Sequence, residues 1–334
     1  MNGTKEEGIY TFLLARPSIT ARAHMRGASN HCYTGMYTCV AFMSKERLSV
    51  LVEQFMQGLS NSNKHIYSPA EILSLIVQLR AEHTFPRSLS DRKFQKSLIE
   101  LGTLKEISFT ASYSFETTRY HFGPFSDYEL ALSLKPGAYL SHGTAGHLHN
   151  LIDQKPKLIH VNKEQSPKNS KGTLTQAAIH RAFANKQRIS AYIVRHEQIE
   201  MILLSGKHSG RLGVTKSIDR QGEQLDLTDL ERTLIDLAVR PSYAGGASAV
   251  AKAYRRAMPK LSISRIAKLL KELNYVYPYH QAIGFYLQNA GQPLSALQPL
   301  REPGLNFDFY LEHGMKQPAF DSTWRVHFAD DSFR

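Results

Sequence analysis

The stretch Thr228-Asp-Leu-Glu-Arg-Thr-Leu-Ile-Asp236, continued by Leu-Ala-Val-Arg-Pro-Ser-Tyr-Ala-Gly-Gly246, is the most organised part of this chain. Thr228 and Glu231 have the spacing of a capping box, in which each side chain binds a backbone amide at a helix start. Three leucines then recur at the spacing of one helix face: Leu230, Leu234 and Leu237. We predict an amphipathic helix that buries these leucines.

The second half of this stretch predicts where the helix ends. Pro241 forces the residue before it out of helical geometry, and Gly245 and Gly246 allow a sharp turn. Arg232 and Asp236 are four residues apart and can pair along the helix, where we expect them on its surface. We therefore interpret this helix first as a structural element of the core, with a defined start and a defined end.

Length and composition place the chain among ordinary globular proteins. Its 334 residues suffice for two domains with their own cores, and 42% hydrophobic with 21% charged residues is typical of that class. It has no run of eighteen apolar residues and no secretory pattern at its start. Cys32 and Cys39 make neither a metal-ligand pattern nor a disulfide framework. We expect a cytoplasmic protein.

The formal net charge of +12 is unevenly distributed. Residues 131–220 contain fourteen basic and five acidic side chains, whereas residues 43–130 contain ten of each. A basic field favours anionic partners, most often nucleic acid and sometimes an acidic protein, although incidental basicity is the alternative. The candidates for a basic surface in the second domain are Lys168, Lys171, Lys207, Arg211, Arg255 and Arg256.

Residues 1–42 show neither a helical nor a strand period. A regular helix pattern begins after Met43, with apolar residues over 48–55 spaced as one face. We expect the natural start to lie near Met43 and residues 1–42 to be an upstream extension or a disordered arm.

Residues 43–130 have the element order of a winged helix-turn-helix domain. After the first helix, Ser68-Pro-Ala-Glu71 is a strong helix start, and Ser90 precedes a third helix that Gly102 ends. Two strand-like runs, 104–110 and 117–122, follow as a hairpin. In a winged helix the third helix enters the major groove and the hairpin touches the DNA backbone. A small helical bundle with a solvated charged face is the alternative.

The third helix carries the candidate DNA contacts. Lys93 and Lys96 are placed to hold phosphates, and Arg92 and Gln95 to face the groove. Arg119 lies on the predicted wing strand.

We place the domain boundary near residue 130, in a connector over 125–134 that ends in the turn signal Lys135-Pro-Gly137. Residues 131–300 alternate strand-like and helical runs and predict a larger mixed α/β domain. Residues 301–334 are a C-terminal extension, frayed from Ala329. The predicted fold class is α+β.

Two segments resemble functional motifs but depart from the spacing that those motifs need. His142, His147 and His149 lack the spacing of a helical zinc site, so we interpret them as packing or capping residues near a short helix that Ser141 begins. The run Ser205–Gly213 resembles a glycine loop, but its lysine precedes the second glycine, which excludes a P-loop. We interpret it as a flexible basic turn.

No nucleophile–base constellation is evident, and we predict no enzyme activity, metal or cofactor. Three acidic residues near the C-terminus, Asp308, Glu312 and Asp321, are conceivable metal ligands of a nuclease. Solvated surface carboxylates are the simpler interpretation.

Two segments resemble a known family. Tyr139-Leu-Ser-His-Gly-Thr-Ala-Gly-His-Leu-His-Asn-Leu151 is similar to the Tyr-x-Ser-His-x-(Ser/Thr)-Ala-x-x-x-His-Gly-Leu segment of AbiEi-like antitoxins. Thr228–Asp236 followed by Arg-Pro-x-Tyr-Ala-Gly-Gly resembles the second hallmark of that family. Asn150 stands where glycine is usual, which predicts a less tight helix exit. The resemblance runs from about Met43 to Gly291.

The resemblance implies a type IV toxin–antitoxin or abortive-infection system. It implies a winged-helix domain that binds operator DNA and represses its own operon, and a larger domain that counteracts a nucleotidyltransferase-type toxin without a stable complex. A stand-alone transcriptional regulator, a metal-dependent nucleic-acid-processing enzyme and a pure protein-interaction module stay as alternatives.

Overall fold

The computed structural model describes residues 45–62, 64–112, 118–167, 173–218 and 222–329. This part of the chain is a mixed α/β structure, consistent with the predicted α+β class. The expectations for residues 1–42 lie outside the described residues.

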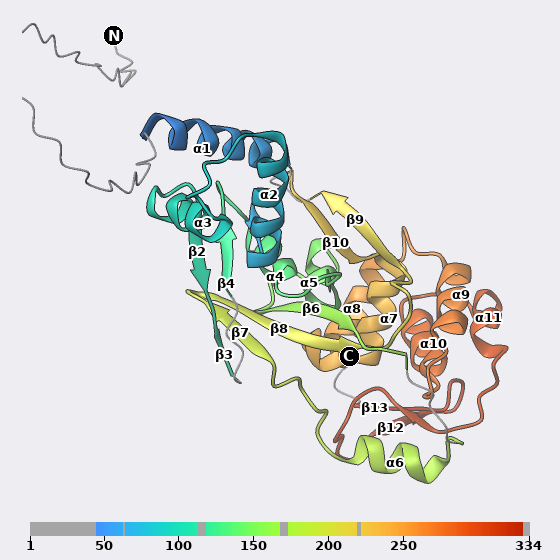
Figure 1. Cartoon of the computed structure of the whole chain (residues 1–334). Coiled ribbons are helices and arrows are strands. Elements are labelled where there is room, and N and C mark those ends of the chain that lie inside the picture. Colours follow the sequence, from blue (N-terminus) through green and yellow to red (C-terminus); the bar gives the residue numbers. More distant parts are fainter. Residues whose placement is uncertain (1–44, 63, 113–117, 168–172, 219–221, 330–334) are drawn as a thin grey trace, which may run out of the picture. The chain divides into compact units, whose positions relative to one another are not determined.

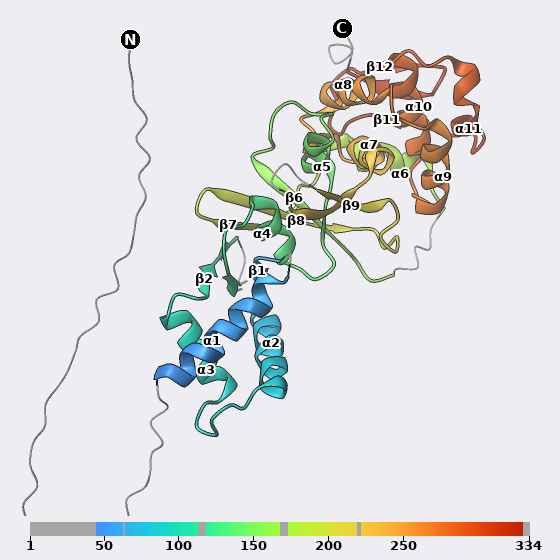
Figure 2. The same ribbon diagram turned by 90° about the horizontal axis from the view of Figure 1, so that it is seen from above.

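Three helices open the described chain and pack on one another (Figures 1 and 2): α1 Lys45–Ser60, α2 Pro69–Glu82 and α3 Asp91–Glu100. The predicted capping box starts α2, because Ser68 Oγ accepts from the Glu71 amide and the Glu71 carboxylate accepts from the Ser68 amide at 2.7 Å. Phe94 of α3 is fully buried. Its ring meets the Phe55 and Phe85 rings edge-on at centroid distances of 6.0 and 5.3 Å, which anchors α3.

A small antiparallel sheet packs against α2, with one strand from before α2 in the chain and two strands from after α3. Its strand order is β1-β4-β2, with β1 Ile66–Tyr67, β4 Thr118–His121 and β2 Lys105–Ser108. The predicted pairing of 104–110 with 117–122 is confirmed by β2 and β4, while the connection over 113–117 lies outside the described residues. Strand β1 is too short for its pattern to be recognised in the sequence.

The predicted connector over 125–134 is a helix, α4 Asp127–Ser133, which Ser126 caps by accepting from the Glu129 amide at 3.2 Å. Leu130 is fully buried, in one cluster with Ile66 of the small sheet and with residues of the larger sheet described next. The boundary that we placed at residue 130 therefore falls inside a helix, and the apolar core runs across it.

A seven-stranded mixed sheet forms the centre of the second part of the chain, in the order β3-β7-β8-β6-β5-β10-β9. Its strands are β3 Thr110–Ala111, β5 Tyr139–Leu140, β6 Leu158–Glu164, β7 Ile193–His196, β8 Ile199–Gly206, β9 Val214–Ile218 and β10 Gln224–Thr228. The β6–β8 and β5–β10 pairs are parallel and the others antiparallel. Strands β7 and β8, which are separated by two residues, pair as an antiparallel hairpin.

Helix α7, Leu230–Val239, is the centre of a helical layer (Figure 1). The surrounding helices include α5 His142–Leu148, α8 Ala247–Ala257, α9 Ile263–Leu273 and α10 Tyr279–Asn289, with α6 Gln176–Ala184 and α11 Gln298–Arg301 further out. Leu234 and Leu237 are fully buried as predicted, whereas Leu230 is partly buried.

The predicted capping box of α7 is wrong. Strand β10 extends to Thr228, whose hydroxyl lies 2.7 Å from that of Thr233, so the chain turns one residue later. Asp229 is the N-cap and accepts from the Arg232 amide at 2.8 Å. Glu231 instead accepts from the Ser262 amide at 2.9 Å, which ties α7 to the start of α9.

The predicted pair of Arg232 and Asp236 forms, with 2.9 Å between Nε and Oδ1, but it is not on the surface. The two side chains are 3% and 6% exposed. Arg232 Nη1 also donates to the Leu212 carbonyl at 2.6 Å. Burial alone would lower the pKa of Arg232, but the adjacent Asp236 carboxylate, together with Tyr275 and Tyr139, outweighs burial and raises it. This ion pair is therefore part of the core.

The Gly245-Gly246 turn forms where it was predicted, after a short 3-10 helix over Pro241–Tyr243. Both glycines have left-handed backbones, with φ of 94° and 99°. Glu312 Oε1 accepts from the Ala247 amide at 2.6 Å and lies 3.1 Å from where a Cβ at Gly246 would stand. The turn therefore brings the C-terminal segment against the start of α8.

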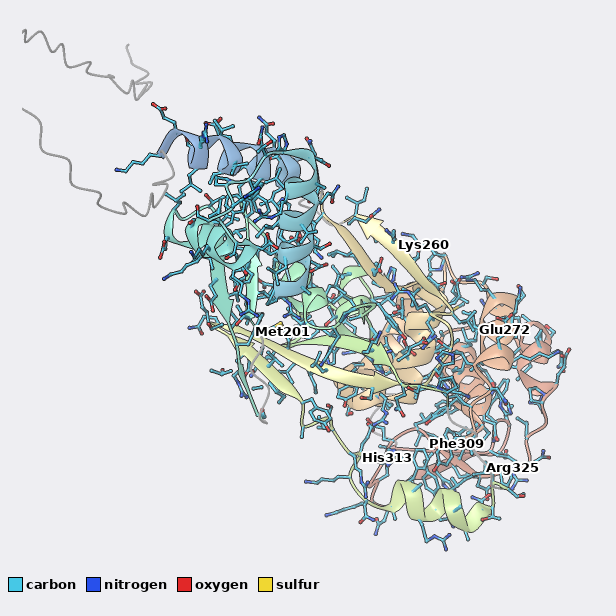
Figure 3. All side chains as sticks on the ribbon, viewed as in Figure 1. Met201, Lys260, Glu272, Phe309, His313 and Arg325 are labelled. Atoms are coloured by element: carbon cyan, nitrogen blue, oxygen red, sulfur yellow. The ribbon has the colours of Figure 1, made fainter. Side chains whose placement is uncertain are left out.

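Residues predicted as a C-terminal extension belong to the core. They form a three-stranded sheet of β11 Phe309–Tyr310, β12 Ala319–Asp321 and β13 Val326–Phe328, around which Figure 3 shows Phe309, His313 and Arg325. Trp324 is fully buried, and its ring lies 2.2 Å from where a Cβ at Gly284 of α10 would stand. Glycine is therefore required at that point of α10. The predicted frayed tail largely falls outside the described residues.

Candidate functional site

The outward face of α3 is the strongest candidate for a binding surface. Ser90 caps the helix by accepting from the Lys93 amide at 3.4 Å, and Phe94 and Leu98 hold its inner face in the core. Arg92, Lys93 and Lys96 are exposed. Three of the four predicted α3 contacts therefore share the solvent face of one rigidly anchored helix.

The acidic residues near α3 do not neutralise this face. Asp91 is bound by Arg80 at 2.7 Å, and among the described residues no carboxylate lies within 4.0 Å of the Arg92 or Lys93 side-chain nitrogens. Lys96 is 3.5 Å from Glu100, with both side chains more than half exposed. An exposed pair of this kind contributes little and exchanges readily for another anion. The N-terminal half of α3 is therefore a basic surface next to a helix N-terminus, which itself favours anions.

Gln95 is not free to face a groove as predicted. It is partly buried, and its side chain is hydrogen-bonded to the Tyr120 hydroxyl of β4. A side chain held against the sheet cannot reach a base edge, so we remove Gln95 from the candidate contacts.

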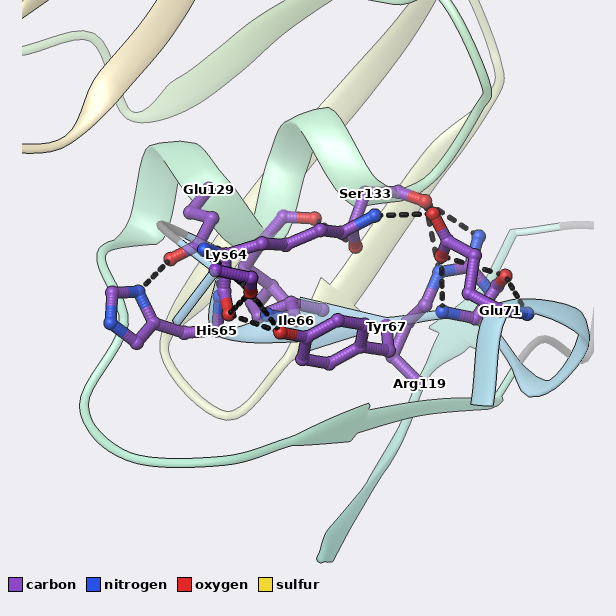
Figure 4. Close-up of polar contacts among 11 residues, drawn as sticks. Lys64, His65, Ile66, Tyr67, Glu71, Arg119, Glu129 and Ser133 are labelled. Carbon is purple, nitrogen blue, oxygen red and sulfur yellow. Dashed lines mark hydrogen bonds and ion pairs between the residues drawn. The ribbon is translucent and has the colours of Figure 1, made fainter. Parts of the chain in front are cut away.

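Arg119 is likewise not a surface residue. It is 6% exposed, and its guanidinium donates to the Ser133 carbonyl at 2.9 and 2.7 Å and to the Leu134 carbonyl at 3.0 Å (Figure 4). These carbonyls end α4, where a helix dipole favours a cation. Burial lowers the pKa of Arg119. The prediction of a wing contact is therefore wrong, because on a strand with both neighbours paired the side chain points to α4.

Three of the six basic residues predicted for the second domain bind other segments of the chain. Lys207 donates to the Leu273 carbonyl at 2.6 Å, Arg211 lies 2.6 Å from Asp226, and Arg256 lies 2.6 Å from Asp153. Arg255 is exposed on α8. Lys168 and Lys171 lie outside the described residues. Three of the four residues of this set that the structure describes are therefore engaged within the chain itself.

The glycine loop over 205–213 surrounds an anion of the chain itself. Glu164 accepts from the Ser209 and Arg211 amides, each at 3.0 Å, and from the Ser209 hydroxyl. Burial raises the pKa of Glu164, but these hydrogen bonds outweigh burial and lower it. The loop is thus an ordered carboxylate cradle rather than the flexible turn we predicted.

The ring nitrogens of the three histidines in 142–149 each contact a different group and do not come together as the ligands of one metal ion would. His142 contacts Ser141 Oγ at 2.8 Å, His147 the Ile152 carbonyl at 3.1 Å, and His149 the Thr228 carbonyl at 2.7 Å. Ser141 occupies the N-cap of α5 without a side-chain cap bond. The prediction that these histidines pack and cap is in line with these contacts.

His142 lies in a small cluster of side chains formed with Thr144, His160 and Tyr243. His160 Nδ1 lies 3.2 Å from Thr144 Oγ1, and the Tyr243 ring meets both histidine rings at centroid distances of 5.4 and 5.2 Å. Burial lowers the pKa of His142 and of His160 to about 3 each. Both imidazoles are therefore neutral at ordinary pH and hold α5 against β6 and the turn after α7.

Asn150 follows α5 with φ of 59°, and its amide donates to the His147 carbonyl at 2.9 Å. Asparagine tolerates this left-handed conformation better than most residues. The looser helix exit that we predicted is therefore not found.

The three carboxylates considered for a nuclease each have a structural partner. Asp308 lies 2.8 Å from Arg325 Nη2, Asp321 accepts from the Trp324 amide at 2.8 Å, and Glu312 binds the turn after α7. Within the described ranges a different trio has converging donor atoms: His65, Glu129 and Glu223. Their distance apart in the sequence gave no pattern by which to find them.

No family model and no curated protein matches the sequence. Among solved structures, the chain is similar to the RV2827C protein from Mycobacterium tuberculosis, with 13% identity and a TM-score of 0.49 over 85% of this chain and 93% of that chain. No helix in the described part of this chain is long and apolar enough to cross a membrane.

Proposed function

We propose that this chain is a DNA-binding regulator in which α2 and α3 form the helix-turn-helix of a winged-helix domain and α3 enters the major groove. One observation carries the proposal: Arg92, Lys93 and Lys96 project from a helix that Phe94 and Leu98 fix in a core. The order of three helices followed by the β2–β4 hairpin supports it.

On this proposal the contacts divide into two kinds. Lys93 and Lys96 bind phosphates and set the register of the helix on the duplex, which adds affinity without sequence preference. Arg92 is exposed near the start of α3, where a guanidinium has the geometry to bind a guanine edge with two hydrogen bonds. Arg92 is therefore the side chain to which we assign sequence discrimination.

The resemblance of two segments to AbiEi-like antitoxins supports a narrower proposal. The protein represses its own operon and counteracts a nucleotidyltransferase-type toxin, without catalysis and without a stable complex. Many residues of those two segments, such as Ser141, Thr144, Arg232 and Asp236, are buried around α7. Their role in this proposal is to shape the second part of the chain rather than to contact a partner.

The experiment for DNA binding measures fluorescence anisotropy of the full chain on a duplex from upstream of its own reading frame. A scrambled duplex of the same length is the comparison. We expect the upstream duplex to bind at least about 10³-fold more tightly at physiological salt. Equal affinities for the two duplexes would contradict an operator-specific role.

The experiment for the antitoxin role first looks for a nucleotidyltransferase reading frame next to that of this chain and then expresses that protein with the wild-type chain or with Arg92→Ala/Lys96→Ala. We expect both to restore growth, because the variant removes only the α3 contacts. Failure of both to restore growth would leave a stand-alone regulator, provided that operator binding holds.

The nuclease alternative predicts magnesium-dependent cleavage that is lost in Asp308→Asn/Asp321→Asn. We expect no cleavage, because both carboxylates are already engaged with Arg325 and the Trp324 amide.

A further inference from the structure

His65, Glu129 and Glu223 come from three separate segments and converge at one point. His65 directly precedes β1, Glu129 lies on α4, and Glu223 directly precedes β10. One donor atom from each lies within 4.8 Å of the other two. His65 Nδ1 is 3.1 Å from Glu129 Oε2 and 4.0 Å from Glu223 Oε1.

Each carboxylate has its second oxygen fixed by the protein. Glu129 Oε1 accepts from the amides of His65 at 2.6 Å and Ile66 at 3.2 Å. Figure 4 shows the other contact of this pair, between the His65 ring and the Glu129 carboxylate. Glu223 Oε2 accepts from the Ser126 hydroxyl. The remaining oxygens, Glu129 Oε2 and Glu223 Oε1, are turned toward His65 Nδ1. Outer hydrogen bonds of this kind orient the ligands of metal sites.

The side chains are sheltered but reachable. His65, Glu129 and Glu223 are 33%, 17% and 15% exposed, so an ion can enter from the histidine side and keep a water ligand there. One imidazole nitrogen and two carboxylate oxygens suit a transition ion such as Zn²⁺, whereas Mg²⁺ and Ca²⁺ prefer oxygen alone. In a tetrahedral zinc site the ligand atoms stand about 3.4 Å apart. Side-chain shifts of roughly 1 Å or less would reach that geometry here.

We propose that His65, Glu129 and Glu223 form a binding site for Zn²⁺ or a similar divalent transition ion. The ion joins the strand of the small sheet to α4 and to the start of β10 in the large sheet. Its binding stabilises the junction between the proposed DNA-binding domain, which contains the small sheet, and the rest of the chain. The site lies on different elements from the basic face of α3, so the ion supports that face without touching DNA.

The test is metal binding by the chelator-treated full chain in which Cys32→Ser and Cys39→Ser remove the thiols. Zn²⁺ affinity is measured by calorimetry, and Co²⁺ binding by visible absorption. The variants are His65→Gln and Glu223→Gln. Glu129 is left intact because it also holds two backbone amides, and His180→Gln and Glu197→Gln are exposed matched controls.

We expect one Zn²⁺ per chain at this site, at least about tenfold weaker binding in each of the two variants, and no change in the two controls. Zn²⁺ should raise the melting temperature of the parent protein, but not that of His65→Gln, and Mg²⁺ should not. The proposal is overturned if His65→Gln and Glu223→Gln bind Zn²⁺ as the parent does, or if the parent binds none. Equal stabilisation by Mg²⁺ would also overturn it, since the imidazole would then not be a ligand.

Discussion

Helices α3 and α7 are each ten residues long, each begins at a side-chain cap, and each carries acidic and basic residues. They differ in what surrounds them. Helix α3 buries Phe94 and Leu98 and exposes its charges, whereas α7 buries eight consecutive residues, Glu231–Ala238, including an ion pair. Charges in α7 therefore specify how the core is assembled, and charges in α3 are available to another molecule.

This difference shows that a distinctive sequence pattern and a functional surface need not lie in the same segment. The segment with the most distinctive pattern, Thr228–Gly246, builds the interior of the protein. The less distinctive helix, Asp91–Glu100, carries the side chains to which we assign function. A motif can be specific because many buried contacts must be met at once, and a binding surface needs few such contacts.

The largest contrast should come from the ion pairs of the two helices. Asp236→Ala leaves Arg232 buried without its carboxylate, and we expect a loss of about 3–5 kcal/mol in the free energy of unfolding. Lys96→Ala breaks the exposed pair with Glu100 and should cost less than about 1 kcal/mol. Urea denaturation of both variants measures the two values.

A double variant checks the cause of that loss. Arg232→Met/Asp236→Leu removes both charges and should recover much of the stability lost in Asp236→Ala. A loss below about 1 kcal/mol in Asp236→Ala would contradict a buried, tightly coupled pair.

The next effect is the pH dependence contributed by His142 and His160 beside α7. Burial lowers the pKa of each to about 3, below about 6.5 in the unfolded chain. Between these values the unfolded chain binds protons that the folded chain does not, so stability falls as pH drops below about 6.5. From pH 6.5 to 5.5 we expect a loss of about 1 kcal/mol per histidine.

Thermal or urea unfolding against pH measures this loss. His142→Gln/His160→Gln should flatten the curve between pH 6.5 and 5.5 by about 2 kcal/mol. An unchanged slope in the double variant would show that other groups carry the pH dependence.

A smaller contrast is expected at the two helix caps. Ser90→Ala removes the cap of α3 and should cost about 1 kcal/mol. Asp229→Ala should cost about 1 kcal/mol more, because the Asp229 carboxylate also binds Arg265. Chemical denaturation of both variants checks the order, and equal losses would mean that the pair with Arg265 adds nothing.

Much of the helical structure follows from local signals. The capping box at Ser68, the cap at Ser90 and the proline and glycines after α7 placed helix ends from short-range chemistry alone. Strand β1, helix α4 and the burial of the C-terminal segment in the core were missed because tertiary packing decides them. Leu130, for example, is buried only because two sheets meet there. The capping box of α7 failed because pairing within β10 took Thr228 into a strand.

The candidate site was predicted only in part, because local spacing reveals the face of one helix but not contacts between distant segments. Helical spacing correctly put Arg92 and Lys96 opposite Phe94 and Leu98, with Lys93 flanking, since one helix defines both faces. Gln95 and Arg119 were assigned wrongly because their partners, Tyr120 and the end of α4, are distant in sequence or unrecognised as structure. The trio of His65, Glu129 and Glu223 spans more than 150 residues and has no local signature.

The comparison of the two helices is tested most directly by the salt dependence of operator binding. In Arg92→Ala/Lys96→Ala we expect stability to change by about 0.5 kcal/mol or less, while operator affinity falls and the slope of log K against log salt decreases in magnitude by about 1, because Lys96 binds a phosphate and Arg92 a base edge. The control Lys268→Ala/Lys316→Ala removes two exposed charges elsewhere and should leave the slope unchanged. An Arg92→Ala/Lys96→Ala protein that binds the operator with the wild-type slope and affinity would contradict the assignment of function to α3.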